Sequence, residues 1–96
     1  MDISYEAALL NVADEYARMV DAHGGKSLAR VATIVVNRGS FFERLREGGG
    51  CSARNLDKVA DWFREPANWP EEKVSEAAAA ALAGIGRPVF APQAAA

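Results

Sequence analysis

The sequence contains too few cysteines and histidines for several common kinds of site. Cys51 is its single cysteine, so the chain cannot form an internal disulfide, which fits a reducing compartment such as the cytoplasm. His23 is its single histidine, which argues against a histidine-based zinc site or a serine–histidine triad within one chain. We therefore expect no enzyme activity, no metal and no other cofactor.

Long apolar runs are missing as well. No run approaches the roughly 18 apolar residues that suggest a membrane span. The first residues lack the basic segment and apolar core of a signal peptide. We expect no membrane partner and a cytoplasmic location. With 96 residues, 50% of them hydrophobic and 25% charged, the chain has the composition of one small globular domain.

The net charge of −2 hides an uneven distribution of charge along the chain. Residues 1–25 sum to −4, residues 26–58 to +4 and residues 59–96 to −2. A basic face on a mildly acidic protein is typical of a surface that meets a polyanion. On charge alone, however, an ordinary solvated surface is the more common explanation.

Hydrophobic periodicity predicts an all-α fold, a compact bundle of four to five short helices. An apolar stripe at helical spacing predicts a first helix over residues 4–22, with Ser4 as its N-cap. Ser27 is the N-cap expected for a second helix, over residues 27–36. The β-branched run at residues 33–36 could also form a strand, but the chain offers no partner strand.

A third, short helix is predicted after a turn at residues 37–39. Ser40 and Glu43 have the spacing of a capping box, in which each side chain bonds the backbone amide of the other. The helix should therefore start at Phe41, and the three glycines at residues 48–50 should end it.

The rest of the chain divides into one more core helix and a C-terminal part. Asn55 is the expected N-cap of a helix over residues 55–65, whose apolar stripe faces the core. This helix completes a domain over residues 1–70. We expect residues 71–96 to hold a helix over 71–82 and then a frayed tail.

The second and third predicted helices form a candidate helix-turn-helix. In such a unit the first helix braces the second, whose first residues enter the DNA major groove. Ala32 fits the small residue needed where the two helices cross. The apolar residues that would lock the helices together are Val31, Val35, Phe42 and Leu45.

Several motifs follow one another through the middle of the chain. They are Ser27-Leu28-Ala29-Arg30-Val31-Ala32-Thr33, Gly39, Leu45, Gly48-Gly49-Gly50, Trp62-Phe63 and Asn68-Trp69-Pro70. With them, residues 27–63 resemble the helix-turn-helix of lambda-repressor-like (Cro- or XRE-type) bacterial DNA-binding proteins. More widely, residues 16–70 resemble small bacterial helix-turn-helix proteins of unassigned role. The pattern departs at the turn, where Val36 occupies the usual glycine position, so the register of the recognition helix stays open.

The resemblance implies that the end of the turn and the recognition helix, residues 40–48, read bases in the major groove. Arg38 and Arg44 can each pair with guanine through two hydrogen bonds. We expect Glu43 to close the capping box, and we regard a core ring as the more common role for Phe41 than contact with a thymine methyl. The base-reading candidates are Arg38, Ser40, Phe41, Glu43, Arg44 and Glu47.

Contacts with DNA phosphates are expected where helix N-termini lie near positive charge. The starts of the second and fourth predicted helices meet this condition. Arg46 could either join these contacts or pair with an acid on the surface. The phosphate-binding candidates are Lys26, Ser27, Arg30, Arg46, Ser52, Arg54, Asn55 and Lys58.

Together these features predict a sequence-specific double-stranded-DNA-binding transcriptional regulator in the cytoplasm, at the nucleoid. A homodimer on a palindrome is expected, with the apolar stripe Val74/Ala78/Leu82 as its contact, and RNA polymerase or another regulator is a candidate partner. Two alternatives stay open. The acidic ends of the chain favour a protein-interaction adaptor or anti-regulator on a helix-turn-helix scaffold. The same motif could also hold DNA in a phage-type packaging or recombination complex.

Overall fold

The computed structural model describes residues 4–49 and 51–90, and within these ranges the chain contains helices and no strand. The predicted all-α fold is confirmed, and residues 33–36 are helical. None of the helices in the described ranges has the length and apolar character needed to cross a lipid bilayer. The five α-helices are α1 (Tyr5–His23), α2 (Leu28–Val36), α3 (Phe41–Arg46), α4 (Ala53–Arg64) and α5 (Glu76–Gly84). Two short 3₁₀ turns, η1 (Pro66–Asn68) and η2 (Pro70–Glu72), connect α4 to α5.

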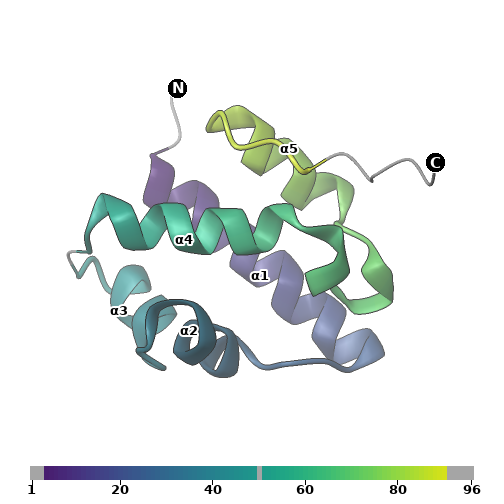
Figure 1. Ribbon diagram of the computed structural model, residues 1–96, viewed down its shortest axis with the longest axis horizontal. Coiled ribbons are helices and arrows are strands. Elements are labelled where there is room, and N and C mark those ends of the chain that lie inside the picture. The colour runs from purple at the N-terminus through teal and green to yellow at the C-terminus, as the bar shows by residue number, and fades with distance from the viewer. Residues whose placement is uncertain (1–3, 50, 91–96) are drawn as a thin grey trace.

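The helices are arranged on two sides of α4 (Figure 1). Figure 1 shows α2 and α3 together on one side of α4 and α5 on the other. The long α1 runs across the bundle and packs against α3, α4 and α5, while α2 packs against α3 and α4. The bundle therefore holds the candidate helix-turn-helix, α2 and α3, against a scaffold made by α1 and α4.

Serine caps begin four of the five α-helices. In each, the serine oxygen accepts a hydrogen bond from the backbone amide three residues later. The predicted caps Ser4 and Ser27 are confirmed. The predicted cap Asn55 is wrong, because Ser52 precedes it with an extended backbone and α4 begins at Ala53. Asn55 lies inside the first turn, and its amide donates to the Ser52 hydroxyl at 3.2 Å.

α3 starts at Phe41, as predicted, but without the predicted cap. Ser40 has φ −89° and ψ 10°, and its side chain makes no capping hydrogen bond, so the predicted capping box with Glu43 does not form. A cap needs an extended backbone that points the side chain at the first amides of the helix. Here the preceding turn runs directly into the helix, since the Phe41 amide donates to the Arg38 carbonyl at 3.1 Å.

A cluster of aromatic rings fills the centre of the core. The ring of Tyr16 lies 5.5 Å from that of Trp62, 5.6 Å from Phe63 and 5.4 Å from Trp69, centroid to centroid. Trp69 is 3% exposed, and its indole nitrogen donates to the Phe63 carbonyl at 2.8 Å. Trp69 therefore packs the link after α4 back onto the domain.

The last helix begins later than predicted and buries its apolar stripe within the chain. Glu71 and Glu72 have positive φ, so the segment predicted as a first helical turn is irregular, and α5 starts at Glu76 after the Ser75 cap. Ala78 and Leu82 are fully buried in the core, and α5 packs against α1. This stripe is therefore covered by the chain itself, and the expectation that it forms a dimer contact is wrong.

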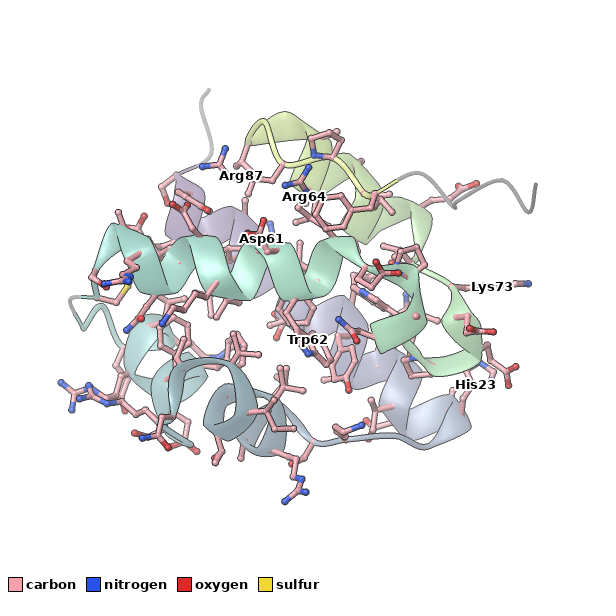
Figure 2. The ribbon with its side chains drawn as sticks, viewed as in Figure 1. His23, Asp61, Trp62, Arg64, Lys73 and Arg87 are labelled. Atoms are coloured by element: carbon pink, nitrogen blue, oxygen red, sulfur yellow. The ribbon has the colours of Figure 1, made fainter. Side chains whose placement is uncertain are left out.

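The segment after α5 packs along α4. The prediction of a frayed tail is therefore wrong for residues 87–90. Residues 91–96 lie outside the described part of the chain. The Arg64 side chain donates to the Pro88 carbonyl at 2.7 Å, and its guanidinium lies 4.1 Å from the centre of the Phe90 ring. Nearer the start of α4, Arg87 and Asp57 form an ion pair at 3.2 Å. Arg64 and Arg87 lie on the α5 side of α4, and Trp62 lies on the opposite side (Figure 2).

Candidate nucleic-acid interface

The lysines and arginines fall into two groups according to their partners. Arg18, Arg46, Arg64 and Arg87 each form an ion pair with a carboxylate, at 2.6–3.2 Å. The other seven form no ion pair with a described residue. Six of these belong to residues 26–58 and are exposed. We call these six the basic set: Lys26, Arg30, Arg38, Arg44, Arg54 and Lys58.

The seventh cation without an ion pair, Lys73, lies elsewhere. Figure 2 places it at the end of the molecule far from α3, near His23. Each cation of the second half of α4 and of the chain beyond it, apart from Lys73, is held by a neighbouring acid. Positive charge that is available to a polyanion is therefore concentrated on α2, α3 and the first half of α4.

The outer face of α2 combines charge with an exposed apolar side chain. Arg30 and Ile34 are four residues apart on this helix, so they share a face, and both are exposed. Ile34 is 52% exposed, the largest exposed fraction among the large hydrophobic residues of the described chain. Val31 and Ala32, on the inner face, are fully buried, as the predicted crossing of α2 with its neighbours requires.

The turn between α2 and α3 forms although Val36 occupies the position where the helix-turn-helix pattern has glycine. Asn37, the residue after Val36, adopts the left-handed conformation with φ 56° and ψ 34°. Its amide donates to the Thr33 carbonyl at 3.0 Å and so ends the helix. Asparagine tolerates this conformation better than other non-glycine residues, so it takes the role that glycine has in the common pattern.

Short α3 exposes few side chains. Phe41, Phe42 and Leu45, half of its six residues, are buried. Phe41 is 4% exposed, so it serves as a core ring and has almost no surface to offer to a base. Ser40, Glu43, Arg44 and Glu47 are exposed, as is Arg38 in the turn. These five are the base-reading candidates that the structure leaves on the surface.

Arg46, one of the phosphate-binding candidates, is paired with an acidic residue of α1. Its guanidinium forms an ion pair with Asp14 of α1 at 2.6 Å, and this contact raises the pKa of the arginine. Of its two predicted roles, pairing with a surface acid is therefore the one observed. The acidic character of the first helix was visible in the sequence, but only the fold brings Asp14 and Arg46 together across 32 residues.

The other phosphate candidates remain at the surface. The Ser27 and Ser52 oxygens accept the amides of Arg30 and Asn55 as N-caps, which leaves each hydroxyl proton able to donate to a phosphate. The carbonyl of Lys26 is fixed by the Tyr16 hydroxyl at 2.8 Å. Arg54 and Lys58, one turn apart on α4, are exposed, whereas Asn55 is half-buried.

A polar pocket of about 360 Å³ lies between the end of α2, α3 and the start of α4. Its walls include two members of the basic set, Arg38 and Arg44, and none of the acidic residues in the described part of the chain. Cys51 also lines it; burial, aided by the charge of Glu6, raises the pKa of this thiol. Sequence reasoning attached no binding role to Cys51, and no local signal placed it beside the two arginines. The remaining lining residues are Val36, Asn37, Phe41, Leu45, Gly49, Ser52 and Asn55.

Among the residues that the structure describes, no three histidine, cysteine, aspartate or glutamate side chains gather as a metal site would require. No family model, no curated protein and no solved structure matches this chain.

Proposed function

We propose that this protein binds double-stranded DNA through the basic set and acts as a sequence-specific transcriptional regulator. The observation that carries this proposal is the distribution of unpaired charge. The cations of the α2–α3 unit and of the start of α4 are exposed, and apart from Arg46 they form no ion pair with a described residue. Neutralisation of phosphates by such side chains supplies most of the affinity of non-specific DNA binding.

The α2–α3 unit supports a division of roles. Arg38 and Arg44 flank the start of α3, where a recognition helix presents its side chains to base edges, and arginine pairs well with guanine. Ser27 and Ser52 lie at the starts of α2 and α4, on either side of α3 in the sequence, where phosphates are commonly bound. So few base-reading side chains give limited affinity, and we propose that two copies act together on a palindromic site.

The test is fluorescence anisotropy of the protein with a labelled mixed-sequence duplex, repeated over a series of salt concentrations. The plot of log affinity against log salt should have a slope of several units, about 0.9 for each phosphate neutralised. The double variant Arg38→Ala/Arg44→Ala should weaken binding strongly and make the slope shallower by up to about 2. Lys73→Ala removes an exposed cation from outside the basic set, which likewise has no ion-pair partner among the described residues, and should leave binding nearly unchanged.

Two results would contradict the proposal. One is the absence of binding at low salt with tens of micromolar protein, roughly the range of non-specific affinity. The other is an equal loss of affinity in the double variant and in Lys73→Ala, because binding would then depend on net charge and not on the basic set. If binding holds, selection of preferred sites from a random pool tests sequence specificity, and sedimentation with and without the site tests the dimer.

A second candidate function is a protein-interaction module on the same scaffold. It is favoured by the small exposed surface of α3, where three of six residues are buried and Arg46 is held by Asp14. Such a module should retain a protein partner in a pull-down when Arg38 and Arg44 are both replaced by alanine. In a DNA-binding regulator, the same double variant should instead abolish binding to the DNA duplex.

A further inference from the structure

The pocket between α2, α3 and α4 has the chemistry of an anion site. Two arginines, Arg38 and Arg44, line it, and neither has an ion-pair partner in the described chain. Asn37 and Asn55 add side-chain amides that donate hydrogen bonds. Among the residues that the structure describes, no carboxylate lines the pocket, and the acidic charge that acts on Cys51 is that of Glu6.

The other wall of the pocket is apolar. Half-buried Val36 supplies most of it, while Phe41 and Leu45 belong to the core cluster, which holds them in place, and present only their edges. A volume of about 360 Å³ falls at the small end of the range typical of small-molecule sites, on the order of 300–1,000 Å³. The combination of a fixed apolar wall and convergent donors fits a compact organic anion better than a bare ion.

We propose that this pocket binds a small organic oxyanion, a phosphate monoester or a carboxylate on an apolar or aromatic body. The guanidinium groups of Arg38 and Arg44 donate hydrogen bonds to the oxyanion, because the paired N–H donors of arginine match the geometry of both phosphate and carboxylate. The body of the ligand rests on Val36 and on the narrow exposed edges of Phe41 and Leu45.

Binding of such an anion does not require that the protein bind DNA. If the DNA-binding function holds, the two ligands share Arg38 and Arg44 and compete. A metabolite bound in the pocket would then release the protein from its DNA site. The metabolite would thus act as an effector of the regulator. This regulatory consequence rests on the proposed function, whereas the pocket chemistry does not.

The single cysteine of the chain offers a direct readout. Cys51 is exposed and lines the same pocket, and no other thiol can react. The rate at which neutral iodoacetamide alkylates the native protein at a fixed, mildly alkaline pH therefore reports whether the pocket is filled. The probes are adenosine monophosphate and benzoate, compared with inorganic phosphate, uncharged adenosine and sodium chloride at matched ionic strength.

We expect adenosine monophosphate or benzoate to protect Cys51 in a saturable way, while adenosine and chloride do not. Which of the two protects identifies the oxyanion as a phosphate monoester or a carboxylate. Arg38→Ala/Arg44→Ala should shift the protecting concentration upward by roughly tenfold or more, the loss expected when charged hydrogen bonds are removed. Lys73→Ala should leave protection unchanged, and circular dichroism should show that both variants keep their helix content.

Three outcomes would overturn the proposal. The first is alkylation of Cys51 at the same rate with every probe. The second is protection by inorganic phosphate as strong as that by the organic anions, which would leave no role for the apolar wall. The third is protection by a DNA duplex but by no small anion, which would make the pocket part of the DNA surface alone. Calorimetric titration of the native protein with the same probes is the second measurement. If the protein binds the anion but no DNA duplex, the proposed DNA-binding function fails while the pocket proposal stands.

Discussion

Asp14 on α1 accepts a 2.6 Å hydrogen bond from the guanidinium of Arg46 at the end of α3. This contact joins the acidic first helix to the shortest helix of the bundle. It also neutralises one exposed cation close to Arg44, which has no ion-pair partner in the described chain. The positive charge available to a polyanion therefore depends on which arginines the first helix engages.

Replacing Asp14 with asparagine should strengthen DNA binding. The change removes one negative charge and releases Arg46, so the affinity should rise several-fold at low salt and the salt dependence should steepen. Both side chains are more than half exposed, so the free energy of unfolding should fall by no more than about 1 kcal/mol. Anisotropy and urea denaturation measure the two effects. The control is Asp21→Asn, the same charge change at an exposed α1 residue that forms no ion pair with a described residue. Equal gains in both variants would refute a specific role for Arg46.

Gly49→Ala should destabilise the fold. A Cβ atom at this position would lie 2.9 Å from the carbonyl oxygen of Arg44, which also accepts the Gly49 amide at 2.7 Å. Because this neighbour is backbone, the turn that ends α3 must shift, at a cost of about 1–3 kcal/mol in the free energy of unfolding. Gly84→Ala, where an added Cβ meets nothing within 4 Å, should be neutral or stabilising by up to about 1 kcal/mol. Equal effects of the two changes in urea denaturation would contradict this account of Gly49.

Two serines that precede helices should respond differently to removal of the hydroxyl. Ser27 caps α2 by accepting the Arg30 amide at 3.1 Å, whereas Ser40 makes no capping bond to α3. Ser27→Ala should therefore lower the free energy of unfolding by about 1 kcal/mol. Ser40→Ala should change it by less than about 0.5 kcal/mol. A loss at Ser40 as large as that at Ser27 would show that the capping box forms in solution.

Tyr5 should make the stability sensitive to alkaline pH. Burial and the hydrogen bond to Asp57 raise the pKa of its hydroxyl from 10.0 to about 12. The folded protein holds this proton more tightly than the unfolded chain does, so the stabilisation is complete below pH 10 and is lost as the pH rises toward about 12. Tyr5→Phe should remove this contribution, because phenylalanine has no proton to release. The check is the difference in urea midpoint between native protein and variant, which should shrink over that window; a constant difference would contradict the raised pKa.

Much of the local structure follows from short-range rules that the sequence displays. The caps Ser4 and Ser27, the apolar stripes and the position of Pro66 predict α1, α2 and the end of α4, because each depends on neighbours within one or two turns. The errors occur where two short-range patterns compete. Both Ser52 and Asn55 are residue types that cap helices. Ser52 comes first and has the extended backbone of a cap, so α4 begins after it and Asn55 lies inside the helix.

The start of α5 illustrates a different limit. The acids and alanines after Pro70 have the composition of a helix, but the chain must turn there to bring α5 against α1. Glu71 and Glu72 take positive φ to make that turn. The packing of the apolar stripe on α1 therefore overrides helix propensity, which is worth only tenths of a kcal/mol per residue, roughly.

The sequence by itself determined the helical class, most helix boundaries and the concentration of positive charge in residues 26–58. Only the tertiary structure decided which charges are available, because an ion pair such as Asp14–Arg46 joins residues far apart in the chain. It also buried Phe41, ordered residues 87–90 along α4 and gathered the walls of the pocket from three helices. Periodicity describes which face of a helix turns inward. It carries no information about which distant side chain that face will meet, since that depends on how whole helices pack together.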